Sequence, residues 1–132
     1  MIFVDTSVWV AAFRSADGLE AESLRLLLDR DEVALAAPVK VEILAGASGR
    51  ERARLRRLLS ALPTAYPIAG TWELIDSWLE RAAAAGERFG FADLLIGALA
   101  AERDGRLWSL DSDFARMAAL RWVTLFAPAR PG

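Results

Sequence analysis

The chain has 132 residues, of which 55% are hydrophobic, and its formal net charge is −2. This length and composition suit one domain, residues 1–132, whose core is large enough to need no disulfide or structural metal. Cysteine and histidine are both absent, which excludes disulfides, zinc sites built on thiolate or imidazole, and catalysis by a cysteine nucleophile or an imidazole base.

The first half of the chain alternates strand and helix patterns. From the spacing of apolar residues we predict strands at 2–4 and 33–37 and helices at 6–13, 19–29, 39–47 and 50–62. Asp5 stands at the first junction between a strand and a helix. Pro38 suits the first turn of a helix, so Glu42 is predicted near a helix N-terminus, where negative charge is stabilised.

The second half continues this alternation. We predict strands at 65–68, 107–110 and 122–126 and helices at 71–85, 92–103 and 113–119. Trp72 and Trp78 share one side of their predicted helix and are interpreted as core residues. The helix at 92–103 is almost wholly apolar, which is typical of a central helix, so Asp93 in its first turn needs a partner for its charge.

The alternation of strands and helices predicts an α/β fold with a mainly parallel central sheet. Asp5 and Asp111 each follow a predicted strand. Sites in open α/β sheets form in the crevice beyond the carboxyl ends of the strands. We therefore expect these two carboxylates, which come from separate strands, to meet.

Four acidic residues stand in unusually apolar surroundings: Asp5, Glu42, Asp93 and Asp111. Carboxylates are rarely buried unless they are paired or bind a metal. If the four converge, their repulsion must be relieved by protonation or by cations, and oxygen ligands favour Mg²⁺ or Mn²⁺. Such ions activate water and stabilise a departing oxygen without histidine, which is the chemistry of a nuclease.

Four segments also resemble PIN-domain ribonucleases, most closely the VapC-type toxins of toxin-antitoxin pairs. They are Val4-Asp5-Thr6-Ser7-Val8-Trp9, the isolated Glu42, the stretch from Phe91 to Ala100, and Trp108-Ser109-Leu110-Asp111-Ser112-Asp113-Phe114. The resemblance covers essentially the full chain. It implies a three-layer α/β/α domain in which Asp5, Glu42, Asp93 and Asp111 build the Mg²⁺ or Mn²⁺ site.

The resemblance also points to supporting residues. The family often has a second acid at the position of Asp113, which either binds metal, acts through water or caps the helix that follows. Thr6 or Ser7 is expected to orient Asp5 or the attacking water, and the resemblance favours Ser7. Ser109 stands where the family commonly has threonine, and it keeps the hydroxyl.

Each acid has a simpler interpretation when it is considered alone. Asp5 suits the N-cap of a helix, Glu42 the dipole of its own helix, Asp111 a turn, and Asp93 the cap of the apolar helix. These alternatives stay open for the single residues, whereas the motifs considered together favour the metal site.

The net negative charge argues against RNA binding by bulk electrostatics. The arginines are concentrated, however, and five of them lie between positions 50 and 57. Arg50, Arg54 and Arg57 form either an RNA-binding face or a solvated helix face, and Arg88, close before Asp93, is a second candidate for RNA contact.

The resemblance implies two protein partners, a second copy of the chain and a small antitoxin, and Trp9 and Phe13 are candidates for such a surface. The amino terminus has no basic residue before its apolar stretch, unlike an export signal, and the cleanest apolar stretch, 94–101, is shorter than the roughly 20 residues that span a bilayer. We expect a cytoplasmic protein without a membrane segment.

The leading hypothesis is therefore a metal-dependent endoribonuclease, the toxin of a toxin-antitoxin pair. Two alternatives are a receiver-like protein that is phosphorylated on Asp5 or Asp111, and a non-catalytic PIN-like binding module. The receiver-like alternative normally requires a downstream lysine, and Lys40 is the single lysine of the chain.

Overall fold

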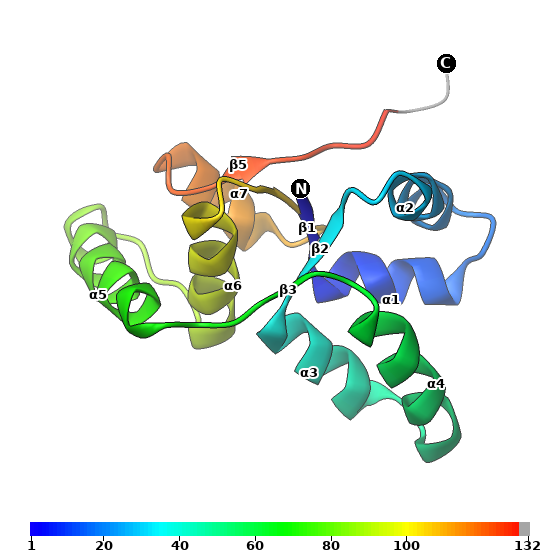
Figure 1. Ribbon diagram of the computed structural model, residues 1–132. Coiled ribbons are helices and arrows are strands. Elements are labelled where there is room, and N and C mark those ends of the chain that lie inside the picture. Colours follow the sequence, from blue (N-terminus) through cyan, green and yellow to red (C-terminus); the bar gives the residue numbers. More distant parts are fainter. Residues whose placement is uncertain (130–132) are drawn as a thin grey trace.

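The computed structural model describes residues 1–129, and within them seven helices surround a five-stranded sheet (Figure 1). The strands are β1 (Ile2–Val4), β2 (Val33–Ala36), β3 (Thr64–Ala65), β4 (Arg106–Trp108) and β5 (Thr124–Leu125). The helices are α1 (Thr6–Arg14), α2 (Leu19–Asp29), α3 (Ala37–Gly46), α4 (Gly49–Ser60), α5 (Ala69–Ala84), α6 (Phe91–Glu102) and α7 (Ser112–Ala119).

The strand order is β3-β2-β1-β4-β5, and every pair of neighbours is parallel. The prediction of an α/β fold with a mainly parallel sheet is therefore confirmed. In the centre, Val4 of β1 pairs with Trp108 of β4, and the backbone N–H of Asp5 donates to the Trp108 carbonyl at 2.9 Å. Because parallel strands end at one edge, the residues that follow β1 and β4 are brought side by side.

Helices cover the sheet on both sides. In Figure 1, α1, α2 and α4 lie to the right of the strands, and α5 and α6 lie to the left. Residues 94–100 of α6 are all buried, as predicted for a central helix, and β1 and β2 are buried along their whole length. Within residues 1–129, no helix combines the length and the apolar character that crossing a membrane requires.

The position of Glu42 was predicted wrongly. Helix α3 begins at Ala37, one residue before Pro38, so Glu42 lies in its second turn and the first turn contains no acid. Proline tolerates the first positions of a helix because its missing N–H has no intrahelical partner there. The helix therefore starts earlier than the proline suggests, and the helix dipole does not account for the charge of Glu42.

Two predictions about tryptophans were also wrong. Trp78 is buried, as expected, but Trp72 is 45% exposed and stacks on the exposed ring of Phe91 with 6.2 Å between the ring centroids. Trp9, a candidate for a partner surface, is 1% exposed, and its indole N–H donates to the Val4 carbonyl at 3.2 Å. Phe13 is exposed, as that interpretation requires.

Gly105 lies in the turn between α6 and β4, against the side chain of Phe3 in β1. A Cβ atom at this position would lie 2.5 Å from a ring carbon of Phe3, which is buried in β1. We predict that Gly105→Ala lowers the free energy of unfolding by about 1 to 3 kcal/mol, the usual cost of overpacking a core.

Chemical denaturation measures this change, and Gly46→Ala is the matched control because a Cβ at Gly46 meets nothing within 4 Å. Equal stabilities of the two variants would contradict the close packing of Phe3 against residue 105.

Candidate active site

Three carboxylates converge beyond the carboxyl edge of the sheet. Asp93 comes from the first turn of α6, and Asp111 and Asp113 come from the start of α7. One oxygen from each of the three lies within 4.8 Å of the others, and this is the acidic group of metal-ligating size found within residues 1–129. Asp93 and Asp113 are half-buried and Asp111 is exposed. We call these three residues the acidic group.

Asp5 lies beside the acidic group but is held differently. It is the N-cap residue of α1, as its simpler interpretation predicts, but its side chain makes no capping hydrogen bond, so capping does not account for its charge. The residue is 6% exposed, and Oδ2 accepts hydrogen bonds from Ser7 Oγ at 2.8 Å and from Ser109 Oγ at 2.7 Å. Two hydroxyl donors therefore stabilise the buried charge.

The two serines are themselves fixed by the backbone that follows β4. Ser7 Oγ accepts from the N–H of Leu110 at 3.0 Å, and Ser109 Oγ accepts from the N–H of Asp111 at 3.0 Å. The two hydroxyls lie 3.2 Å apart. These bonds connect the end of β1 to the turn that carries Asp111, so Ser7 and Ser109 are in position to orient Asp5.

Glu42 does not join the acidic group. Its carboxylate Oε1 accepts from Thr6 Oγ1 at 3.0 Å, which makes Thr6 a partner of Glu42 and leaves Asp5 to the serines. Glu42 is exposed and lines a cavity between α1 and α3, together with Phe13 and Arg14. A single residue, Thr6, thus connects Glu42 to the segment that carries Asp5.

Asp111 caps α7, and Asp113 does not. The Oδ1 of Asp111 accepts from the backbone N–H of Asp113 at 2.9 Å, so the suggestion that Asp113 is the cap is wrong. Asp111 therefore has a structural bond through one oxygen and a second oxygen that remains available. Within residues 1–129 Asp93 makes no capping hydrogen bond, and its alternative interpretation is wrong as well.

The acidic group perturbs the protonation of its own members. Burial, a hydrogen bond with Asp113 and the charges of Asp111, Asp113 and Asp5 raise the pKa of Asp93 from 3.8 to about 7. The hydrogen bonds from Arg116 and Asp93 lower the pKa of Asp113. These effects favour the protonated form of Asp93, whose carboxyl shares its hydrogen bond with Asp113.

This donor set fits a hard divalent cation. It offers carboxylate oxygens without nitrogen or sulfur ligands, which suits Mg²⁺ or Mn²⁺. In the absence of a cation, burial and, to a lesser extent, the neighbouring carboxylate charges favour a proton on Asp93, which is why its pKa is raised. Asp93 and Asp111 could hold the ion directly, with Asp113 and Asp5 at their side.

The arginine candidates lie in different places. Arg50, Arg54 and Arg57 are exposed on α4, across the strands from α6 in Figure 1, and Arg54 pairs with the exposed Glu51 at 2.8 Å. Arg88 is exposed in the segment that leads into α6. Of the four, Arg88 lies closest in the chain to the acidic group.

Arg116 was missed by the sequence analysis. Its Nη2 donates to Asp113 Oδ1 at 2.8 Å, and its Nη1 donates to the carboxylate of Glu87. The spacing of three residues between Asp113 and Arg116 on a helix is the signal that could have identified the first contact. No local pattern identifies the second contact, because Glu87 precedes a different helix.

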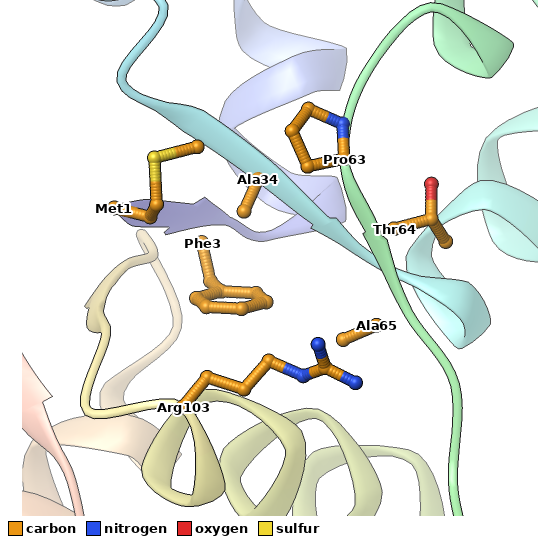
Figure 2. A pocket seen from close by; sticks show the side chains of 7 residues that line it. All are labelled: Met1, Phe3, Ala34, Pro63, Thr64, Ala65 and Arg103. Carbon is orange, nitrogen blue, oxygen red and sulfur yellow. The ribbon is translucent and has the colours of Figure 1, made fainter.

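A separate cavity lies beside β1, β2 and β3 and the end of α6 (Figure 2). It is lined by Met1, Phe3, Ala34, Pro63, Thr64, Ala65 and Arg103. Arg103 is the single charged side chain in this lining and no carboxylate takes part. The cavity therefore offers no ligand set for a cation, and the candidate active site remains at the opposite edge.

Comparisons with known proteins agree with this fold. A family model described as "PIN domain" matches residues 2–120. The chain is 33% identical to VapC ribonuclease Mb1587 of Mycobacterium bovis, over 86% of this chain and 89% of the relative. Ribonuclease VapC11 of Mycobacterium tuberculosis matches with the same identity and coverage.

Solved structures share the architecture. VapBC2 from Rickettsia felis, bound to a DNA fragment from its promoter, superposes with a TM-score of 0.77 at 20% identity and covers 96% of this chain and 98% of its own. VapC20 of Mycobacterium tuberculosis, described as a toxin that cleaves the sarcin-ricin loop, gives a TM-score of 0.68 at 22% identity and covers 99% and 100%. At these identities the likeness concerns the fold.

The raised pKa of Asp93 predicts how the stability of the metal-free protein depends on pH. Folding favours the protonated carboxyl, so this stabilisation is complete below the unfolded pKa and is lost as the pH rises through about 7. We expect the melting temperature in EDTA to fall between about pH 5.5 and pH 8, and to fall less in Asp93→Asn.

Because histidine and cysteine are absent, few other groups titrate in this range. A difference between the pH profiles of the wild type and Asp93→Asn therefore reports on Asp93. Calorimetry on both proteins measures the effect. Identical pH profiles for the two proteins would show that Asp93 is not the titrating group.

Proposed function

The chain belongs to the PIN domain family, and from this membership and its VapC relatives we propose that it is a metal-dependent endoribonuclease, the toxin of a toxin-antitoxin pair. The observation that carries the proposal is the acidic group of Asp93, Asp111 and Asp113, with Asp5 beside it. A family relationship alone gives the fold, whereas this group supplies the chemistry.

Mg²⁺ or Mn²⁺ is the proposed cofactor, held by Asp93 and Asp111 with support from Asp5 and Asp113. A divalent cation at this position supplies activation of water and stabilisation of negative charge on the phosphodiester. The oxygen donors and the raised pKa of Asp93 support this assignment. Metal ions and protons compete for the same carboxylates, so binding strengthens as the pH rises.

The chain's own residues prepare the site before RNA arrives. Ser7 and Ser109 hold one oxygen of Asp5, Oδ2, and within residues 1–129 no donor reaches the other oxygen, Oδ1. This leaves Oδ1 free for a cation or a water molecule. The backbone bond to Asp111 fixes that carboxylate in the same way.

The role proposed for Glu42 is that of a fourth acid at the margin of the site. Its contact with Thr6, the neighbour of Asp5, supports this role. Because Glu42 stands on α3 and outside the acidic group, we propose that it contributes through a cation or water that extends from Asp5.

RNA contact is proposed chiefly for Arg88, because it is exposed and precedes the helix that carries Asp93. Arg50, Arg54 and Arg57 form a second, more distant basic face on α4. Phosphate contacts from either set would add affinity without base specificity.

The remaining proposals concern the whole protein. Residues 1–132 form one nuclease domain that acts in the cytoplasm, pairs with a second copy and is inhibited by a small antitoxin. Among the relatives of similar fold are VapBC complexes from Rickettsia felis and Haemophilus influenzae and a toxin-antitoxin complex from Klebsiella pneumoniae. These relatives support a protein partner.

The geometry disfavours a receiver-like phosphoacceptor. Such a protein needs a lysine beside the phosphorylated aspartate, but Lys40 Nζ donates to Ser60 Oγ of α4 at 3.1 Å. The carboxylate of Asp5 is also buried and already accepts from two hydroxyls. A non-catalytic binding module remains the competing function, and the cleavage assay separates the two.

We predict that the purified protein cleaves an RNA pool with Mn²⁺ and that EDTA abolishes cleavage. Asp93→Asn and Asp5→Asn should each lower the rate by roughly 100-fold or more, the scale on which a preorganised electrostatic group contributes to catalysis. The measurement is the initial rate of RNA cleavage resolved on a gel.

Asp104→Asn is the matched control, because Asp104 lies at the opposite edge with φ 51°, a conformation that asparagine tolerates. Cleavage that persists in EDTA or in Asp93→Asn would refute the proposed mechanism. The absence of cleavage in the wild type under all metal conditions would favour the binding module.

The toxin role predicts a growth phenotype. Expression of the wild-type chain alone should arrest bacterial growth, because uncontrolled RNA cleavage stops protein synthesis. Expression of Asp93→Asn should not arrest growth, and co-expression of the cognate antitoxin should restore growth and co-purify. Arrest by the inactive variant would contradict the toxin role even if the nuclease assay succeeds.

A further inference from the structure

Arg116 joins two separate segments that flank the acidic group. From α7 it reaches Asp113 on its own helix and Glu87 in the segment before α6. The backbone carbonyl of Arg88 accepts from both Nη1 and Nη2 at 3.4 Å. The guanidinium carbon lies 4.6 Å from the centre of the Phe89 ring, which is buried.

These contacts use nearly all of the hydrogen-bonding capacity of the side chain. A guanidinium group has five N–H donors, two on each terminal nitrogen and one on Nε. Each terminal nitrogen of Arg116 already has two acceptors, one of them the Arg88 carbonyl. Little remains for an RNA phosphate, so the geometry favours a role within the protein.

The segment that Arg116 holds leads directly into the helix of Asp93. Glu87 and Arg88 are followed by Phe89 and by Gly90, the N-cap of α6, and Asp93 stands in the first turn. Arg116 therefore fixes the start of α6 relative to α7. These two helices carry the three carboxylates of the acidic group.

The carboxylates themselves do not favour this arrangement. Asp93, Asp111 and Asp113 repel one another, and within residues 1–129 Arg116 is the cation that forms an ion pair with the group. It pairs with Asp113, and within the part of the chain that the structure describes Asp93 and Asp111 have no cationic partner. A rigid, planar fork can hold two acceptors at a set angle, which a single ammonium group cannot.

We propose that Arg116 is a positioning residue of the nuclease site, which joins Asp113 to the Glu87–Arg88 segment and thereby sets the separation between the carboxylates of α6 and α7. This rests on the proposed function, because the acidic group is taken as the metal site. Arg116 touches neither the reacting phosphate nor the cation, and it acts through Asp113 and through the start of α6.

The test compares Arg116→Met and Arg116→Lys with the wild type in the full chain. Mn²⁺ affinity is measured without RNA, from the free-ion signal in electron paramagnetic resonance, and kcat and KM are measured separately on RNA. We call the contacts of Arg116 with Asp113, Glu87 and the Arg88 carbonyl the clamp. Loss of the clamp should weaken Mn²⁺ binding or lower kcat by about 10- to 100-fold, the usual effect of removing a residue that orients metal ligands. KM for RNA should change much less.

Two variants separate the effect of the guanidinium geometry of Arg116 from the effect of its positive charge. Arg116→Lys keeps the positive charge but lacks the planar guanidinium group, so its Mn²⁺ affinity and kcat should resemble those of Arg116→Met. Glu87→Ala keeps the Arg116–Asp113 pair but cuts the link to the segment before α6, so it should reproduce part of the loss. Arg103→Met is the matched control, because Arg103 is an exposed arginine at the far edge of the sheet.

The outcomes are distinct. Wild-type Mn²⁺ affinity and kcat in Arg116→Lys, or in Glu87→Ala, would overturn the clamp. The remaining explanation would be an effect of the positive charge alone. A raised KM with unchanged kcat and Mn²⁺ affinity would indicate direct RNA contact and would also overturn it. If Arg116→Met does not fold, Glu87→Ala decides alone.

Failure of the proposed function would look different. A wild-type protein that cleaves no RNA would refute the nuclease assignment, while the Mn²⁺ affinities of the variants would still report on the clamp. A wild-type protein that cleaves RNA, with variants of unchanged Mn²⁺ affinity and kcat, would refute the clamp alone.

Discussion

Repulsion between carboxylates at the carboxyl edge of the sheet is the constraint to which the rest of the site responds. Three aspartates offer oxygens within 4.8 Å of one another, with a fourth beside them. Separate donors stabilise three of these carboxylates: two hydroxyls donate to Asp5, a backbone N–H donates to Asp111, and Arg116 donates to Asp113. Among the described residues Asp93 alone has no such donor, and burial together with the neighbouring charges raises its pKa to about 7.

The fold explains why this charge can be concentrated at all. β1 and β4 are short, buried and parallel, and the bond from the Asp5 N–H to the Trp108 carbonyl holds their ends together. The buried, apolar helix α6 then presents Asp93 against the start of α7. The stable core thus holds together carboxylates that repel one another. A divalent cation would offset the negative charge that protons offset when no cation is bound.

Much of the fold followed from local patterns, and the site only in part. The leucine spacing that begins after Gly18 predicted α2 correctly at both ends, because capping and periodicity act over a few residues. Strand β5 is shorter than predicted, because Trp122 and Val123 are buried by packing outside the sheet ladder. Pro38 misplaced the start of α3, since the residue before a proline can also begin a helix.

Within the site, the pattern of acids after strands predicted that Asp5 and Asp111 lie at one edge of the sheet, because parallel strands end there. The structure links them indirectly, through Ser109, which binds the carboxylate of Asp5 and the N–H of Asp111. The pattern did not indicate which acid of the Asp111-Ser112-Asp113 sequence caps the helix, since both spacings suit a cap. The link between Arg116 and Glu87 depends on tertiary packing between residues 29 positions apart, and no local spacing encodes it.

The most direct test of the central claim is a crystal structure of the protein soaked in Mn²⁺, with anomalous scattering recorded at the manganese edge. The account predicts an anomalous peak bound by Asp93 and Asp111, beside Asp5, at normal metal–oxygen distances. A peak elsewhere on the surface, or no peak at saturating Mn²⁺ with the carboxylates ordered as described, would contradict it.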